Sequence, residues 1–434
     1  MRRVAFALSF AVLVGGVALG APFLRGPYSG APGDDGITVS WRSTTPLAVR
    51  VEYGPLADYA SDPRFPHSVE VPAPAEDVQA TTHIVLRGLP LATECVYRVV
   101  LLDGEEEVTS PVGSFRTKPS VGDAVGFAVI ADTQHQSTGS NRLQMIGDAV
   151  AADPADLDFV LHAGDVVESP SSEVWDHWFR SFGAMLLRAP FIPVLGNHEN
   201  GDPSYYEAFE LPPGGGRNDE RWWALHWGDV VVVGLDTTAR RAADIEAQQA
   251  WIREHLAGPE PHRFVIFHHP VFSSDPEHGA SHAFDALYHP LLVEMDVDVV
   301  FNGHSHHYER IARDGVTYLV VGGGGAIPRG IAAEPIEGSV VSTEGHHFYV
   351  RVATSEAGIR VETVSVARET PAGTLITDSR LLDGFKLPFS AAGGSAVLGS
   401  IWIIASGATL CGILIVLGTA FCLRHRRARR YAAD

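Results

Sequence analysis

Val300-Phe301-Asn302-Gly303-His304-Ser305-His306 is a short apolar sequence that leads directly into an amide and two imidazoles. The apolar run begins at position 297, and its Val and Phe residues favour a buried β-strand. Polar residues that directly follow a buried strand lie at the edge of a sheet, where the active sites of α/β domains collect. This segment therefore predicts a functional site at the end of a strand.

Four further segments of the sequence repeat this arrangement. Strands are predicted at 126–131, 158–162, 191–195 and 263–267, and the groups that follow them are Asp132-Thr133-Gln134, Asp165, Asn197-His198-Glu199 and His268-His269-Pro270. Helical stretches separate the strands, which favours a layered α/β domain. A single Asp, Asn or His after a strand is most often a cap or a turn residue, but five such strand ends in one domain indicate a shared site.

The residue types at these strand ends are those of a metal site. Carboxylate and amide oxygens together with imidazole nitrogens suit Zn, Fe or Mn, and no cysteine lies nearby to indicate a thiolate site. Because more than about four such ligands are present, the sequence predicts more than one metal ion.

The segment before the α/β strands has a different pattern. Residues 22–118 consist of short alternating apolar stretches separated by turn residues, which is typical of a small antiparallel sandwich. The expected strands are residues 36–42, 48–53, 82–86 and 94–102. Lys118-Pro119-Ser120 is the expected linker to an α/β domain at 122–385.

Both ends of the chain carry apolar runs. Two arginines, an apolar run and small residues are typical of a secretory signal peptide at 1–21. Residues 396–423 are uncharged and long enough to cross a bilayer, and the arginine-rich segment 424–434 follows them. We therefore expect an exported ectodomain outside the cytoplasmic membrane, held by a single C-terminal transmembrane helix, with a stalk at 386–395 and a basic cytoplasmic tail.

The Gly-Gly-Ser step at 393–395 also fits a sorting signal that is cleaved after export, which is the alternative to a permanent membrane anchor. Composition excludes two other features. Because Cys411 and Cys422 fall inside the predicted span, Cys95 is the only cysteine left for the ectodomain, which then has no disulfide partner. A net charge of −20 argues against nucleic-acid binding by a basic face.

Taken in order, the five strand-end blocks resemble the signature of the calcineurin-like metallophosphoesterase superfamily. His304-Ser305-His306-His307-Tyr308-Glu309-Arg310 is similar to the corresponding segment of its purple acid phosphatase branch, and residues 22–118 resemble the fibronectin III-like N-terminal domain of that branch. The resemblance runs from about residue 22 to residue 382. It implies an all-β sandwich followed by an α/β metallophosphoesterase domain, which is a layered β-sandwich flanked by helices.

The resemblance also implies roles for the residues of each matching block. The implied ligands are Asp132 and His306 for the first metal, Asn197, His268 and His304 for the second, and Asp165 as the bridge between the two. His198 would lie beside the substrate phosphate and act in catalysis, and His278 stands where the family often has a phosphate-facing His. In the family the ligand is the His two residues before a Pro, which leaves His269 to a supporting or packing role.

One position departs from the purple acid phosphatase branch. Three residues after Asp165 the branch has a metal-binding Tyr, but this chain has Glu168, so a purple ferric centre is not expected. Gln134 stands two residues after Asp132, where other members of the superfamily place a metal ligand. Either Gln134 or Glu168 would then complete the first metal site.

The resemblance implies an acid phosphatase-like phosphomonoesterase that hydrolyses a small-molecule phosphate ester with two divalent or mixed-valence ions of Fe, Zn or Mn. Two alternatives are a metal-dependent phosphodiesterase that acts on nucleotides or lipid head groups, and a catalytically inactive binding protein on the same fold. All six core ligand positions keep the expected residue, which argues against the inactive protein. The ligands do not distinguish a monoesterase from a diesterase.

Overall fold

The computed structural model describes residues 23–34, 36–73, 80–134, 141–279 and 282–388. Four predicted segments fall outside these residues wholly or in part: the signal peptide at 1–21, the stalk at 386–395, the apolar run at 396–423 and the basic tail at 424–434. The last described strand, β23 (Leu381–Pro388), includes the first three residues of the expected stalk.

The N-terminal part of the described chain, residues 23–116, consists of two antiparallel sheets that share an apolar core. One sheet has the order β1 (Phe23–Gly33), β2 (Gly36–Ser43), β5 (Thr82–Arg87). The other has the order β4 (His67–Val71), β3 (Ala48–Pro55), β6 (Glu94–Asp103), β7 (Glu106–Thr109), with β8 (Gly113–Arg116) also on β6 and α1 (Leu56–Ser61) after β3. Alternate residues of β3 enter the core, where Val49 and Val51 meet Trp41 and Tyr97. The strands expected from alternation coincide with β2, β3, β5 and β6.

The α/β domain contains two larger sheets. The first has the order β11 (Phe191–Pro193), β10 (Phe159–His162), β9 (Gly126–Ile130), β20 (His346–Ser355), β21 (Gly358–Glu369), β22 (Leu375–Thr377), and β23 also pairs with β21. The second has the order β12 (Gly214–Gly215), β13 (Trp222–Trp227), β14 (Val230–Gly234), β15 (His262–Ile266), β16 (Val299–Asn302), β18 (Val316–Val321), β17 (Tyr308–Arg313), β19 (Ser339–Thr343). The central strands are continuous runs of Val, Ile and Phe because both of their faces are buried.

The two large sheets pack face to face. The ring of Phe127 on β9 lies 5.2 Å from the ring of Phe264 on β15 and 6.2 Å from that of Phe301 on β16. Strands β9, β10 and β11 are parallel, and so are β14, β15 and β16. The carboxyl ends of each parallel set therefore share one sheet edge, and the polar residues that follow these strands are placed at those edges.

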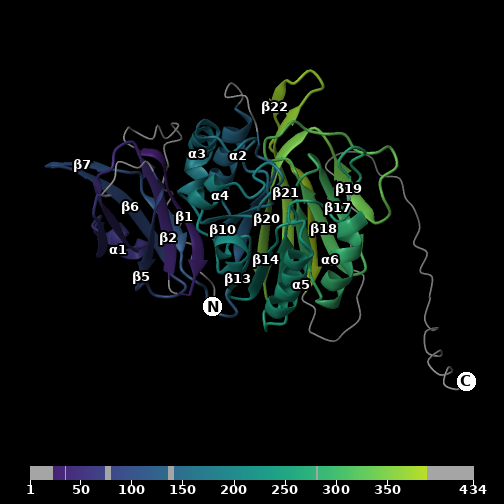
Figure 1. The fold of residues 1–434 in the computed structure, drawn as a ribbon, viewed down its shortest axis with the longest axis horizontal. Coiled ribbons are helices and arrows are strands. Elements are labelled where there is room, and N and C mark those ends of the chain that lie inside the picture. The colour runs from purple at the N-terminus through teal and green to yellow at the C-terminus, as the bar shows by residue number, and fades with distance from the viewer. Residues whose placement is uncertain (1–22, 35, 74–79, 135–140, 280–281, 389–434) are drawn as a thin grey trace, which may run out of the picture. The chain divides into compact units, whose positions relative to one another are not determined.

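Helices cover the outer faces of the two sheets (Figure 1). The helical elements are α2 (Arg142–Ala152), α3 (Ser172–Leu186) and α4 (Pro203–Ala208) near the first sheet, α5 (Ala242–Leu256) and α6 (His282–Glu294) near the second, and the short turn η1 (Arg217–Asp219). The side chain of Ser171 caps α3 by accepting a hydrogen bond from the Val174 N–H at 3.4 Å. Trp175, Trp178 and Phe182 recur at helical spacing and form the buried side of α3.

The first strand, β1, supports α3. Arg25, whose side chain is 1% exposed, donates from Nε to Asp176 at 2.6 Å, and the ring of Tyr28 lies 4.8 Å from that of Phe179. From the same helix Trp178 donates its indole N–H to the Thr133 hydroxyl at 2.9 Å. Because Thr133 directly follows Asp132, this helix links β1 to the end of β9.

The predicted fold and location require a correction, because they include a C-terminal transmembrane helix as a membrane anchor. No helix in the described part of the chain is long and apolar enough to span a membrane. The helices α3 and α5 have 15 residues each. A spanning helix needs roughly 20 predominantly apolar residues.

Candidate metal centre

The first large sheet brings two carboxylates to the candidate centre. Asp132 follows β9 and Asp165 follows β10, and their exposures are 0% and 2%. Both residues have positive φ angles, 56° and 57°, which are uncommon for residues that carry a Cβ. The two strand ends are joined by hydrogen bonds from the Asp132 N–H to the Gly164 carbonyl at 3.1 Å and from the Thr133 N–H to the Asp165 carbonyl at 3.0 Å.

Two glycines leave room for these carboxylates. A Cβ on Gly196 would lie 2.1 Å from Asp165 Oδ1, and a Cβ on Gly303 would lie 2.5 Å from Asp132 Oδ2. Both separations are far shorter than a van der Waals contact, so any larger residue would displace the acids. The glycines before Asn197 and His304 are therefore required for close packing at the centre.

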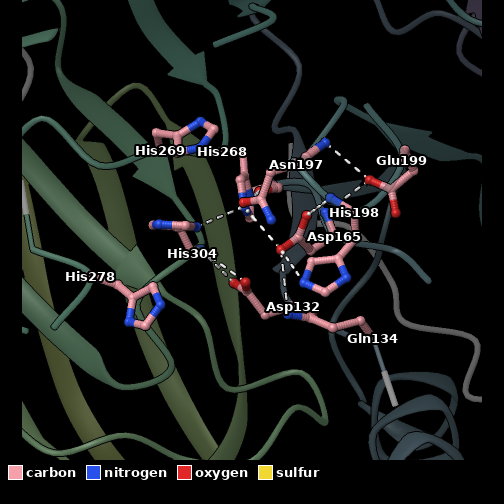
Figure 2. A network of polar contacts seen from close by, with 12 residues as sticks. Asp132, Gln134, Asp165, Asn197, His198, Glu199, His268, His269, His278 and His304 are labelled. Carbon is pink, nitrogen blue, oxygen red and sulfur yellow. Dashed lines mark hydrogen bonds and ion pairs between the residues drawn. The ribbon is translucent and has the colours of Figure 1, made fainter. Parts of the chain in front are cut away.

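The second large sheet contributes imidazoles that face these oxygens (Figure 2). Nε2 of His268 lies 3.1 Å from Asp165 Oδ2 and 3.0 Å from Asn197 Oδ1. His304 places Nδ1 3.3 Å from the same His268 nitrogen, while His306 places Nε2 3.5 Å from Asp132 Oδ1. The structure thus brings together the six residues that the family resemblance implies as metal ligands.

His304 and His306 reach different parts of this cluster because the segment between them is not an extended strand. His304 has a φ of 68°, and its N–H donates to the carboxylate of Asp132 at 2.9 Å. Its ring then lies beside His268, whereas the ring of His306 lies beside Asp132 and Gln134. The two imidazoles are therefore available to two different ions.

Backbone carbonyls determine which nitrogen of His268 and His306 faces the cluster. Nδ1 of His268 lies 3.0 Å from the Ala163 carbonyl oxygen, and Nδ1 of His306 lies 2.8 Å from that of Ile327. A carbonyl oxygen only accepts hydrogen bonds, so each Nδ1 carries a proton. In the neutral rings Nε2 then presents a lone pair, which is the usual second contact of a metal-binding histidine.

The charges of the cluster also fit a bound cation. Within the described residues, the ion pairs of Asp132 and Asp165 are formed with histidines and with no Lys or Arg. Burial lowers the pKa of His268, but Asp165 and then Asp132 outweigh burial and raise the pKa to about 9. Buried carboxylates that lack a fixed cation are costly, so this field favours positive charge at the cluster. The donor set and its charge therefore fit a metal centre.

Gln134 and Glu168, the two alternatives for completing the first site, are placed differently. Gln134 is 5% exposed, and its Nε2 lies 3.3 Å from Asp165 Oδ2 and 3.1 Å from His306 Nε2. Its Oε1 is buried with no hydrogen-bond partner among the described residues. Glu168 contributes its backbone carbonyl, which lies 2.8 Å from His198 Nδ1. Gln134 therefore lies among the residues of the first site with its amide nitrogen toward Asp165 and His306, and Oε1 is the atom with which it could bind an ion.

Three further histidines surround the cluster. Nε2 of His198 lies 3.8 Å from Asp165 Oδ2; burial lowers the pKa of His198, but Asp165 and the Glu168 carbonyl raise it above its ordinary value. The ring of His278 lies 5.4 Å from that of His304, and its Nδ1 is buried with no hydrogen-bond partner in the described chain. The ring of His269 lies 4.6 Å from that of His304. Each side chain predicted for catalysis thus adjoins the cluster.

Two buried glutamates were not predicted for the site. Glu199 is 2% exposed and accepts the N–H groups of Asp165, Val167 and Gly196 at 3.0 to 3.1 Å. Burial and the neighbouring Asp165 raise the pKa of Glu199 to about 7. Its position directly after His198 was a signal in the sequence, but its contacts depend on how two loops meet.

The second unpredicted glutamate, Glu309, orders the segment that leads to His278. Glu309 is 0% exposed and accepts the Ser274 N–H at 2.7 Å and the Ser339 hydroxyl at 2.6 Å. The hydroxyl of Ser305 donates to the His278 carbonyl at 3.0 Å from the same side. The strand that follows the histidine pair thus holds a second loop of the site in place.

Comparisons with known proteins agree with this geometry. The sequence pattern of the family described as calcineurin-like phosphoesterase matches residues 126–308. That span begins with β9 and reaches Tyr308, so it includes all six implied ligands.

Similar proteins include an uncharacterized protein of Mycobacterium tuberculosis, which is 26% identical over 360 residues, or 68% of this chain and 67% of that protein. Purple acid phosphatase 1 of Ipomoea batatas is 25% identical over 269 residues, and the match covers 55% of this chain and 54% of the plant protein. This chain thus spans about half the length of the plant relative.

Among solved structures, the purple acid phosphatase PPD1 of yellow lupin, Lupinus luteus, superposes with a TM-score of 0.64 at 19% identity, covering 81% of this chain and 73% of that one. At this identity the likeness shows a metallophosphoesterase-like α/β fold. These comparisons do not confirm the predicted fibronectin III-like character of residues 22–118.

Proposed function

We propose that this chain, whose residues 126–308 form a calcineurin-like phosphoesterase domain, is a metal-dependent phosphomonoesterase that hydrolyses small-molecule phosphate esters. The observation that carries the proposal is the meeting of the buried Asp132 and Asp165 with Nε2 of His268 and of His306, whose Nδ1 atoms face backbone carbonyls, with no Lys or Arg paired to these acids in the described chain. Similarity to named purple acid phosphatases supports a monoester substrate.

The ligand assignment divides the cluster into two ion sites. Asp132, His306 and Gln134 would hold one ion, Asn197, His268 and His304 would hold the other, and Asp165 would contact both. The donor types suit Zn, Fe or Mn. When bound, a pair of such ions would activate the attacking water and neutralise the phosphate oxygens.

The chain itself supplies a proton donor for the leaving group. Because Nδ1 of His198 faces the Glu168 carbonyl at 2.8 Å, Nε2 is the nitrogen left for the substrate. Nε2 also lies 3.8 Å from Asp165 Oδ2, so it stands beside the proposed bridging ligand. From this place His198 would donate a hydrogen bond or a proton to the departing oxygen.

The asymmetric burial of the cluster suits substrate entry from one side. Asp132, Asp165 and His268 are buried, whereas Asn197 is exposed. An ester would therefore approach over Asn197 and His198 while the carboxylates stay shielded from water. The second implied phosphate contact, His278, adjoins His304 on the opposite side of the cluster (Figure 2).

The test pairs metal content with hydrolysis. Elemental analysis of the purified chain would be combined with turnover of para-nitrophenyl phosphate and of the matching bis(para-nitrophenyl) diester. We expect about two ions per chain and a monoester rate that depends on them. Removal of the ions by a chelator should abolish turnover, and readdition should restore it.

A diester rate well above the monoester rate would replace this proposal with a phosphodiesterase. A chain that binds the ions but hydrolyses neither compound would indicate a binding protein on the same fold. A chain that binds no ions at all would contradict the ligand assignment.

A further inference from the structure

The adjacent residues His268 and His269 are held by chemically different partners. Nδ1 of His268 faces a backbone carbonyl, that of Ala163, at 3.0 Å. Nδ1 of His269 instead faces a hydroxyl, the Oγ1 of Thr237, at 2.9 Å. A carbonyl accepts only, but a hydroxyl both donates and accepts, so the two partners impose different protonation on the two rings.

The hydrogen bonds of Thr237 determine the tautomer of His269. Thr237 is 1% exposed, and its Oγ1 already accepts the backbone N–H of His269 at 3.1 Å. The hydroxyl proton needs an acceptor, and within the described chain the remaining contact of Oγ1 is Nδ1 of His269. Thr237 therefore donates to Nδ1, and the neutral ring carries its proton on Nε2, the reverse of His268.

The support of Thr237 is itself rigid. Thr237 follows β14, which is the parallel neighbour of β15, so it stands beside His269 at adjacent strand ends. The preceding residue, Asp236, is 0% exposed; its N–H donates to Gln248 Oε1 at 2.7 Å, and its Oδ1 accepts the Thr238 N–H at 2.7 Å. The hydroxyl that sets the tautomer is thus fixed by the end of the strand.

His269 adjoins the candidate centre. One nitrogen of each of His268, His269 and His304 lies within 4.8 Å of the others. Figure 2 shows His269, His304 and His278 on one side of the cluster, with Asn197, His198 and Asp165 on the other. The ring of Phe284 lies 5.7 Å from that of His269. Because Nδ1 is held by Thr237, the nitrogen that His269 has free is the protonated Nε2.

A ring nitrogen that carries a proton has no lone pair for a metal ion, but it is a hydrogen-bond donor for an anion. We propose that His269 is a phosphate-binding residue whose Nε2–H donates to a non-bridging oxygen of the bound ester, and that Thr237 is the positioning residue that sets this tautomer. This inference rests on the proposed phosphoesterase function, and it assigns adjacent histidines to two tasks: His268 to an ion and His269 to the substrate.

The experiment measures binding of inorganic phosphate to the full chain loaded with Zn²⁺, by calorimetric titration, together with zinc content and the KM and kcat for para-nitrophenyl phosphate. We expect His269→Ala to weaken phosphate binding and raise KM by about 10- to 100-fold, since it removes one hydrogen bond to a charged group. Its zinc content should equal that of the wild type.

Two pairs of variants separate this role from a structural one. His269→Gln keeps an N–H donor near the position of Nε2 and should restore phosphate affinity to within a few-fold of the wild type, about 1 kcal/mol or less. Thr237→Val removes the hydroxyl and should weaken phosphate binding, whereas Thr237→Ser keeps the hydroxyl and should not. If His269→Ala fails to fold, the comparison of Thr237→Val with Thr237→Ser still decides the matter.

Three outcomes would overturn the inference. Loss of zinc from His269→Ala would show that His269 is a metal ligand. Unchanged phosphate affinity in that variant would show that His269 does not contact the substrate. Equal effects of Thr237→Val and Thr237→Ser would show that the hydroxyl does not set the tautomer of His269. Failure of the proposed function has a different signature, because the zinc-loaded wild type itself would neither bind phosphate nor hydrolyse the monoester.

Discussion

In the first large sheet, parallel strands β9 and β10 end in Asp132 and Asp165; in the second, parallel strands β15 and β16 end in His268 and His304. The two halves are built alike, since each places two polar side chains after a pair of neighbouring parallel strands. Their chemistry differs, because one half supplies carboxylate oxygens and the other supplies imidazole nitrogens. Neither half holds a complete ligand set, so the centre exists only where the two sheets face each other.

The two sheets are also alike at the amino ends of these strands, where an aspartate precedes one strand of each pair. Asp158, before β10, accepts the Gly126 N–H at 2.8 Å, and Asp298, before β16, accepts the Arg263 N–H at 2.8 Å. Asp158 also pairs with Arg116 of β8 at 3.0 Å, a contact that has no counterpart at Asp298 in the described part of the chain. A shared strand arrangement thus carries different charges, and neighbouring elements decide how each charge is satisfied.

The largest expected effect is that of Asp165→Ala, in the half of the centre that supplies the carboxylate oxygens of Asp132 and Asp165 (the oxygen half). We expect at least one ion to be lost and monoester turnover to fall by more than the roughly 10- to 100-fold that removal of an outer partner of a metal ligand costs. Metal analysis and steady-state kinetics measure both effects. Asp158→Asn, before the same strand, is the matched control and should keep the ions; equal metal content in Asp165→Ala would refute the bridging role.

The histidines of the second sheet should belong to two separate ion sites. His268→Ala and His306→Ala should each leave about one ion per chain, because the two rings are assigned to different sites. His226→Ala serves as the control, since that half-exposed ring on β13 contacts Glu260 at 2.8 Å instead of the cluster. Loss of both ions in each variant, measured by elemental analysis, would break the division of the cluster into two sites.

The loop after β11 gives the oxygen half one imidazole that is not an assigned ligand. His198→Ala should lower kcat by about 10²- to 10⁴-fold, the usual contribution of a general acid, while the metal content stays unchanged. The measurement is turnover at full metal occupancy. Unaltered turnover in that variant would remove His198 from the reaction.

The smallest expected effect concerns the two aspartates at the strand starts. Burial raises the pKa of Asp298 from 3.8 to about 6, against the opposing hydrogen bond from the Arg263 N–H. A raised folded-state pKa favours the protonated form, so this contribution to stability is present below about pH 4 and is lost as the pH rises through about 6.

Asp298→Asn should therefore flatten the fall in the free energy of unfolding over this pH range, and at pH 8 it should gain on the order of 1 kcal/mol over the wild type. Denaturant unfolding at several pH values measures it. Asp158→Asn should gain less, because burial also raises the pKa of Asp158 but the variant loses the opposing ion pair with Arg116. Equal gains in the two variants would contradict the difference between the two strand starts.

Local sequence was sufficient for much of the α/β domain. The expected strands near Asp132, Asp165 and His268 are present because runs of Val, Ile and Phe have few alternatives to a buried strand. The membrane prediction was wrong in that no helix among the described residues is long and apolar enough to span a bilayer; the apolar run on which it rested, 396–423, lies outside those residues.

By itself the sequence determined where apolar runs form strands and which residue types follow each strand, because these features depend on neighbouring residues along the chain. Only the tertiary structure decided how the groups combine. The placement of Gln134 against Asp165 and His306, the burial of Glu199 beneath Asp165, and the opposite tautomers of His268 and His269 each require a partner more than 30 residues away in the chain or on another loop. Hydrogen bonds and burial between distant segments set these features, and no local pattern encodes them.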